Sequence, residues 1–124
     1  MAHVIGPDFV ALQVKDLEKS RIFYTELLGF EEAPQCPPGA ILFKSEPIPF
    51  AIRTPLIDLN ATTHRGWGTV LWFSCVHADE LHDTLERNGI KITQQPFDGP
   101  FGRTFSFEDP DGYVLTMHEN NKQA

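Results

Sequence analysis

Two side chains able to do chemistry close the last apolar run of the sequence, where His118 and Glu119 follow residues 113–117. An imidazole and a carboxylate can serve as metal ligands or as acid–base groups. Alternate side chains of a strand share a face, so His118 would share the face of Thr116. A hydrated strand end is the commoner role of such a pair, and both interpretations stay open.

Arg53 is the second candidate, because it ends a short apolar run, residues 50–53, that is typical of a strand. Burying a cation on a central strand is costly unless its charge is paired. Arg53 is therefore expected to contact either an anionic group of a ligand or a nearby carboxylate, for which Asp8 is a candidate. The sequence does not favour one of these partners over the other.

The cysteines and two of the histidines offer less chemistry. Cys36 and Cys75 are too few for a disulfide scaffold and do not form the closely spaced pair of a zinc site, so both are expected to be free thiols. Cys75 is interpreted as a small apolar filler, since no His or Asn has an obvious place beside it. His77 and His82 fall at the start and on the surface of a predicted helix, where exposure is expected.

The composition limits the classes of function. The chain has 124 residues, about one domain, and its formal net charge of -7 disfavours nucleic acid and anionic membranes as partners and suits cationic ligands. No apolar run approaches the roughly 20 residues that span a bilayer. Since the first residues do not resemble a signal peptide, a cytoplasmic location is expected.

The elements that position these residues are predicted to occur twice in the same order. A strand over residues 9–14 precedes a helix that Asp16 caps and Gly29 ends. A strand over residues 69–76 likewise precedes a helix from about Asp79 to a stop at Gly89. Three short strand-like runs follow each helix, at residues 30–32, 40–43 and 50–53 and at residues 90–92, 103–107 and 113–117. Each half is therefore predicted to be a βαβββ module.

Residues 109–112, Asp-Pro-Asp-Gly, predict a hairpin turn between the last two runs. Proline sets φ, aspartate can bond its own backbone, and glycine accepts a positive φ.

The stretch from Leu17 through Phe23-Tyr24 to Leu27-Leu28-Gly29-Phe30 resembles the first-helix signature of the vicinal oxygen chelate superfamily, which includes glyoxalase I and the bleomycin resistance proteins. Residues 107–113, Phe-Glu-Asp-Pro-Asp-Gly-Tyr, resemble its final hairpin. The resemblance covers nearly the whole chain. It implies an α+β fold in which two βαβββ modules form a curved eight-stranded mixed sheet that encloses a ligand cup, with helices on the outer face. We expect one domain over residues 1–124, with modules at 8–54 and 69–119 and a connection at 55–68.

Enzymes of this superfamily usually hold a divalent metal through His or Glu side chains on the first and last strands of each module. In this sequence the two His positions fall on Phe9 and Leu71, and the last Glu position falls on Thr116. The corresponding position of the first module lies among residues 51–54. None of these side chains is a metal-binding carboxylate or imidazole, so the resemblance implies no metal and no other cofactor.

Strand alternation predicts which side chains face the cup. In the first strand these are Phe9, Ala11 and Gln13, with Val10, Leu12 and Val14 toward the helix. In the second module they are Leu71, Phe73 and Cys75, with Val70, Trp72, Ser74 and Val76 toward the helix. Phe9, Phe50, Trp67 and Phe73 would then line or rim an aromatic concavity that suits an organic ligand, while Trp72, Phe105 and Phe107 fill the core.

These expectations lead to functions of different classes. The first is metal-independent binding or sequestration of a small aromatic or cationic organic molecule, as in the bleomycin resistance proteins. One alternative is a glyoxalase- or dioxygenase-like metal enzyme with a site rebuilt from His118, Glu119, His64 or side chains of a partner subunit. Another is a metal-free lyase or isomerase that uses Arg53 and one acidic residue. The predicted ligand-binding residues are Phe9, Gln13, Phe50, Arg53, Trp67, Leu71, Phe73, Thr116 and His118, and no catalytic residue is assigned. A homodimer is expected, because open half-barrels leave sheet edges that are normally covered.

Overall fold

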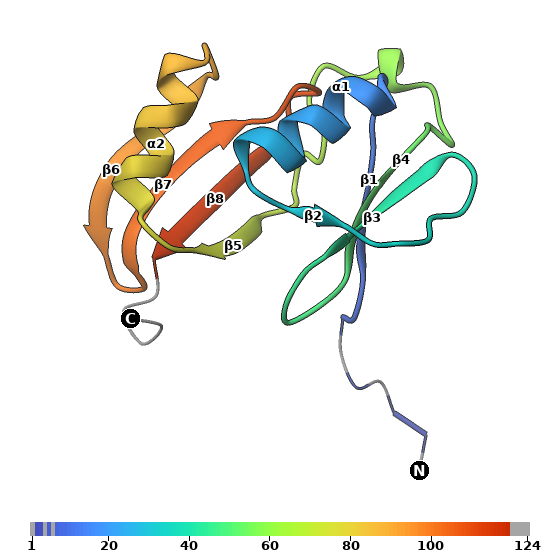
Figure 1. Ribbon diagram of the computed structural model, residues 1–124, viewed down its shortest axis with the longest axis horizontal. Helices are drawn as coiled ribbons and strands as arrows, with labels where there is room; N and C mark the ends of the chain where they lie inside the picture. The colour runs from blue at the N-terminus through green and yellow to red at the C-terminus, as the bar shows by residue number, and fades with distance from the viewer. Residues whose placement is uncertain (1, 4, 6, 120–124) are drawn as a thin grey trace. The chain divides into compact units, whose positions relative to one another are not determined.

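The computed structural model describes residues 2, 3, 5 and 7–119, and it divides into two compact units between Leu59 and Asn60. Each unit contains one βαβββ module with its own four-stranded mixed sheet (Figure 1). The predicted α+β class and the repeated module are confirmed. The eight strands form two separate sheets of four rather than one continuous sheet. No helix in the described part of the chain is long and apolar enough to cross a bilayer.

In the N-terminal unit the strand order is β1-β4-β3-β2, with β1 and β4 parallel and the other neighbours antiparallel. The elements are β1 (Val10–Gln13), α1 (Leu17–Ile22) with a π-helical turn (Phe23–Leu27), β2 (Glu31–Glu32), β3 (Ala40–Lys44) and β4 (Phe50–Arg53).

Local signals set the ends of α1 as predicted. The Asp16 side chain accepts a 3.0 Å hydrogen bond from the Lys19 backbone N–H, which satisfies a donor that the first turn leaves without a partner. The helix then widens into the π-helical turn, where the Leu28 N–H reaches back to the Phe23 carbonyl at 3.2 Å. Gly29 ends it with a φ of +83°, a conformation that glycine adopts without steric cost.

An aromatic cluster forms the core of this unit. The Tyr24 ring lies between the helical segment and the sheet, with its centroid 5.8 Å from that of Phe43 and 5.3 Å from that of Phe50. Phe30 joins both phenylalanines at 5.4 Å. Phe50 is only 2% exposed here, so its predicted place in the ligand cavity is wrong. It fills the core instead, because its position in β4 faces the helical segment.

In the C-terminal unit the strand order is β5-β8-β7-β6, with β5 and β8 parallel and the other neighbours antiparallel. A short 3₁₀ helix (Leu59–Ala61) spans the division, followed by β5 (Leu71–Cys75), α2 (Ala78–Arg87), β6 (Ile92–Gly99), β7 (Gly102–Glu108) and β8 (Val114–Glu119). The register of the edge strand β6 shifts twice against β7, between Ile92 and Gln94 and between Gln94 and Phe97.

The predicted hairpin turn joins β7 to β8. The Asp109 carboxylate accepts 2.9 Å hydrogen bonds from the backbone N–H groups of Asp111 and Tyr113. Gly112 has a φ of +93°, and its N–H donates to the Asp109 carbonyl at 3.0 Å. These contacts are the ones that the Asp-Pro-Asp-Gly chemistry predicts.

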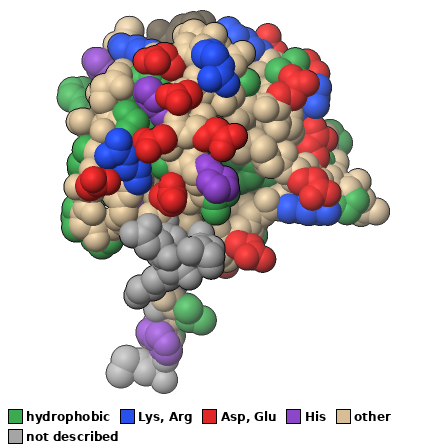
Figure 2. Space-filling model, turned by 60° about the vertical axis from the view of Figure 1, so that its left-hand side comes forward, with side chains coloured by type: hydrophobic (Ala, Val, Ile, Leu, Met, Phe, Trp, Pro, Cys, Tyr) green, Lys and Arg blue, Asp and Glu red, His purple; other side chains and the backbone are tan. Residues whose placement is uncertain are grey.

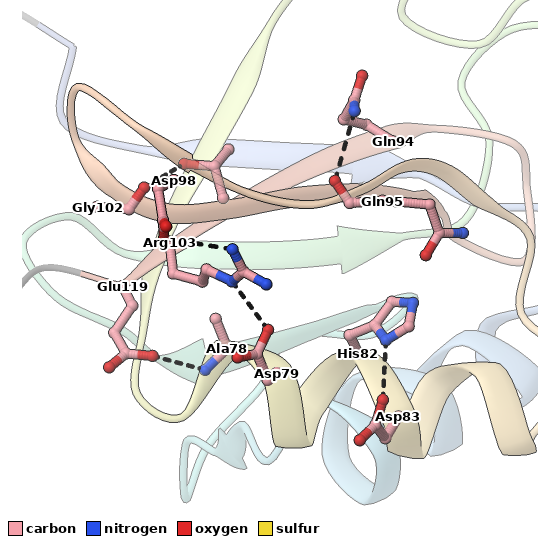
Figure 3. A network of polar contacts seen from close by, with 11 residues as sticks. Ala78, Asp79, His82, Asp83, Gln94, Gln95, Asp98, Gly102, Arg103 and Glu119 are labelled. Carbon is pink, nitrogen blue, oxygen red and sulfur yellow. Dashed lines mark hydrogen bonds and ion pairs between the residues drawn. The ribbon is translucent and has the colours of Figure 1, made fainter.

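Side chains from the strands fix the start of α2 (Figure 3). His77 precedes the helix with a left-handed φ of 56° and provides no side-chain cap. The Glu119 carboxylate at the end of β8 accepts a 2.8 Å hydrogen bond from the Ala78 N–H. Arg103 of β7 donates to Asp79 at 3.0 Å and to Asp98 of β6 at 3.2 Å. The first turn of α2 is thereby attached to β8 through Glu119 and to β7 through Arg103.

The core of this unit lies between α2 and the strands. Phe105, Phe107, Leu115 and Met117 are buried, and the ring of His82 meets that of Phe105 edge-on at 5.6 Å. His82 is 7% exposed, so its predicted surface position is wrong. Its Nδ1 lies 3.0 Å from an oxygen of Asp83, and its Nε2 is buried without a hydrogen-bond partner. The helix turns this position toward the sheet, alongside Leu85.

Candidate ligand-binding faces

Each sheet has one face covered by its own helix and one face that this helix leaves open. In the N-terminal unit Leu12 and Val14 are buried and Ala11 is exposed, which confirms the predicted facing of β1. Gln13 pairs in register with Arg53 of β4, so both belong to the open face. Phe9 is exposed just before β1.

The polar residues of this open face have different partners. Gln13 Oε1 accepts hydrogen bonds from the backbone N–H groups of Leu56 at 2.6 Å and Ile57 at 3.2 Å, so Gln13 fastens the segment that follows β4. Arg53 Nε donates to the Thr54 carbonyl at 3.1 Å. Among the residues that the structure describes, no carboxylate forms an ion pair with Arg53, and the pairing with Asp8 is not observed. Contact with an anionic ligand group remains a proposal for Arg53.

The predicted facing of β5 is wrong by one residue. Leu71 pairs with Leu115 and Phe73 with Met117, and in a parallel pair such partners share a face. Leu115 and Met117 are buried on the face that α2 covers, so Leu71 and Phe73 lie on that face too. The side chain of Trp72 lies on the open face and is 50% exposed. The sequence concealed this, because four consecutive residues, 70–73, are apolar and no polar alternation marks the faces.

Three ring-bearing side chains gather on the open face of the C-terminal sheet, and we call them the aromatic triad: Trp72, Phe101 and His118. The Trp72 ring meets His118 edge-on at 5.6 Å and Phe101 edge-on at 5.9 Å. Phe101, in the loop between β6 and β7, is 64% exposed. His118 Nδ1 lies 3.1 Å from the carbonyl oxygen of Phe101, which joins the end of β8 to this loop.

A pair of hydroxyl groups adjoins the aromatic triad on the same face. Ser106 and Thr116 are partners in the β7–β8 ladder, and their side-chain oxygens lie 2.9 Å apart. Thr116 shares the face of His118, as predicted, because both alternate with the buried Leu115 and Met117. The open face thus presents exposed rings next to a small polar group, the combination that organic ligand sites use.

Trp67 does not belong to the open face of the C-terminal sheet. Trp67 is 86% exposed in the connection before β5, where its ring contacts His64 at 5.1 Å, so it lies off the sheet.

Burial, together with the nearby charge of Glu119, raises the pKa of the Cys75 thiol to about 11. A neutral thiol at this position agrees with a filler and not with a nucleophile.

The residues at the implied metal positions do not fit a divalent metal. Phe9 and Leu71 provide no donor atom, Leu71 also lies on the helix-covered face, and the Thr116 hydroxyl is hydrogen-bonded to Ser106. Within residues 2, 3, 5 and 7–119, no group of three or more His, Cys, Asp or Glu side chains gathers closely enough to hold a metal ion. A transition-metal site needs three or four such donors at one point.

Acidic side chains are spread among basic ones on the face that Figure 2 shows. Arg103 lies between Asp79 and Asp98, and Lys91 lies 3.2 Å from Glu108. The net charge of -7 is therefore distributed and marks no single cation site on this face.

Sequence reasoning missed Trp72 and Phe101 as candidate site residues. The clear alternation of β8, with Leu115 and Met117 apolar and Thr116 and His118 polar, fixes the faces of that strand. The same alternation could have predicted which side chains of β5 lie on the open face only if the parallel register of β5 with β8 had been known. For Phe101 the available signal was an aromatic residue between Pro100 and Gly102 in a turn, where core packing is unusual.

Comparisons with known proteins agree with this architecture. The family model described as the glyoxalase/bleomycin resistance protein/dioxygenase superfamily matches residues 6–117. The uncharacterized protein YetH of Bacillus subtilis is 26% identical over 113 residues, which cover 89% of this chain and 94% of YetH.

Solved structures share this fold. A glyoxalase family protein from Bacillus anthracis matches with a TM-score of 0.73 at 23% identity, over 98% of this chain and 99% of that one. A glyoxalase/bleomycin resistance protein from Albidiferax ferrireducens T118 matches with a TM-score of 0.69 at 28% identity, over 91% and 97%. The chain belongs to the glyoxalase/bleomycin resistance protein/dioxygenase superfamily.

Proposed function

We propose that this protein binds a small aromatic organic molecule, without a metal ion, on the open face of its C-terminal sheet. The observation that carries the proposal is the exposure of Trp72 and Phe101 beside His118 and the Ser106–Thr116 pair. Exposed rings that also contact one another offer a planar ligand a large apolar area at little cost in side-chain entropy. The ligand cup that the superfamily fold implies would enclose this face.

The open face of the N-terminal sheet is proposed as a separate contact surface. Arg53 and Phe9 are its candidate contacts, and a ligand bound there would offer an anionic group to the Arg53 guanidinium. Gln13 is assigned a positioning role there, because its carbonyl oxygen already holds two backbone groups.

The test uses the two tryptophans separately. In the Trp67→Phe variant only Trp72 fluoresces, and in the Trp72→Phe variant only Trp67 does. A panel of neutral and cationic aromatic compounds should quench Trp72 and leave Trp67 unchanged. Quenching of Trp67 alone would move the ligand to the connection between the units. If no compound of the panel binds, the proposal is wrong.

Neighbouring positions in β5 provide a matched control. Trp72→Ala should weaken binding by roughly 1 to 3 kcal/mol, the usual cost of losing a well-placed aromatic contact. Phe73→Ala lies on the opposite face, so it should lower the melting temperature without a specific loss of affinity. Equal losses of affinity in the two variants would contradict the assignment to the open face.

We also propose that the protein is a homodimer. Each sheet ends in edge strands, β1 and β2 in one unit and β5 and β6 in the other, and such edges are normally protected. Light scattering should report about twice the chain mass of 14.0 kDa. A monomer that persists across a wide range of concentration would contradict this.

A further inference from the structure

We infer that His118 Nε2 is a hydrogen-bond acceptor that selects aromatic ligands carrying an O–H or N–H donor, such as phenols and aryl amines. The inference rests on the proposed function, since it specifies which aromatic molecules the open face would prefer.

The hydrogen bond at the other nitrogen of this ring fixes the tautomer of the neutral imidazole. His118 Nδ1 lies 3.1 Å from the Phe101 carbonyl oxygen, and a carbonyl can only accept. Nδ1 therefore carries the hydrogen and donates it. In the neutral ring Nε2 then has no hydrogen and presents a lone pair.

Two contacts hold this ring in place. The backbone bond to Phe101 sets the tautomer, and the Trp72 ring lies edge-on at 5.6 Å. Trp72 is itself in edge-on contact with Phe101 at 5.9 Å. Ladder partners Ser74 and Thr104 flank the position of His118 in β8. The imidazole is thus oriented before any ligand arrives, which reduces the entropy lost on binding.

Nε2 has no hydrogen-bond partner among the residues that the structure describes. The rings beside it, those of Trp72 and Phe101, are at least half exposed. A planar molecule packed against these rings could direct a hydroxyl or amine hydrogen to Nε2. A ligand that offers only acceptors at this point, such as an ether or a carboxylate, would meet a lone pair instead.

The experiment compares para-cresol with its methyl ether, which has nearly the same ring and lacks the donor. Calorimetric titration of the full chain should show the phenol binding about tenfold more tightly, the effect of one well-placed hydrogen bond. His118→Phe keeps a planar ring and removes both nitrogens, so the phenol should fall to the affinity of the ether. His118→Gln can place an amide oxygen near the position of Nε2 and should retain part of the preference.

Each outcome has a distinct meaning. If neither compound binds and a broader aromatic panel also fails, the proposed function fails. If both bind equally to the wild type, the open face binds rings and the inference about His118 is overturned. Equal loss of both compounds in His118→Phe, with an unchanged melting temperature, would assign His118 to ring packing and also overturn it. Nitrogen NMR of the His118 ring gives an independent readout, since a hydrogen on Nε2 of the neutral ring would contradict the stated tautomer.

Discussion

The Glu119 carboxylate caps a helix to which it is not adjacent in sequence, accepting a 2.8 Å hydrogen bond from the Ala78 N–H at the start of α2. His77 precedes that helix without a side-chain hydrogen bond, so the cap comes from the end of β8. The bond also attaches α2 to the parallel β5–β8 pair.

Glu119→Ala should therefore lower the free energy of unfolding by about 1 kcal/mol, the usual cost of removing a helix cap. Glu80→Ala is the matched control, because Glu80 lies exposed in the same first turn, near the helix dipole, and forms no ion pair within the described residues. Urea denaturation measures both. Equal effects of the two variants would mean that the bond to Ala78 adds nothing beyond charge.

The thiol of Cys75 should react slowly in the folded protein. Burial, and to a smaller extent Glu119, raises its pKa from the ordinary value of 9.0 to about 11, and the thiolate is the reactive form. In the Cys36→Ser variant, alkylation of Cys75 at pH 9 should be roughly tenfold or more slower in buffer than in denaturant. Equal rates in the two conditions would contradict the raised pKa.

The same shift predicts a pH dependence of stability. Below pH 9.0 the thiol is neutral in the folded and the unfolded chain. Between pH 9.0 and about 11 it ionises only in the unfolded chain, so the free energy of unfolding falls as the pH rises through this window. In Cys75→Ser the part of this fall that is due to the thiol should be absent. If the free energy of unfolding falls equally with pH above 9 in the variant and the wild type, the thiol does not contribute.

His82→Leu should raise the free energy of unfolding by about 1 kcal/mol. The exchange removes a buried Nε2 that has no hydrogen-bond partner, and leucine retains an apolar contact with Phe105. The bond from Nδ1 to the exposed Asp83 and the 3.8 Å contact of Nε2 with the exposed Glu86 are lost as well, and Asp83→Ala and Glu86→Ala measure these losses separately. A thermal melt of His82→Leu below that of Asp83→Ala would show that the imidazole stabilises the core.

Gly102→Ala should cost more than about 3 kcal/mol. A Cβ at Gly102 would lie 1.8 Å from the Glu119 carbonyl oxygen, and the φ of +100° is strained for any other residue. Gly89→Ala shares a positive φ of +76° but has no atom within 4 Å of the added carbon, so it should cost only about 1 kcal/mol. Urea midpoints that coincide for the two variants would mean that β7 shifts freely away from Glu119.

Local chemistry was enough to predict much of the fold. The cap at Asp16, the stop at Gly29 and the Asp109 turn depend on neighbours within a few residues, and all three were confirmed. The facing of β5 was not predictable in this way. Leu71 and Trp72 are both apolar, and their faces depend on a parallel register with β8 across about 40 residues of sequence.

The candidate site was therefore predicted in part. His118 and Thr116 lie on the open face as expected, since their own strand alternates clearly. Phe50 and Phe73 belong to the helix-covered faces, and Trp72 takes the exposed position. The burial of His82 was missed because a histidine on a charged helix gives no sign of facing inward.

The two register shifts in β6 affect how the protein tolerates high concentration. A regular edge strand offers an unbroken row of N–H and C=O groups on which another chain can add a strand and begin aggregation. In β6 the shifts interrupt that row, and Pro96, which lies within the second shift, has no N–H to offer. This edge of the C-terminal sheet is therefore a poor template for fibril growth, even though Phe97 is exposed beside it.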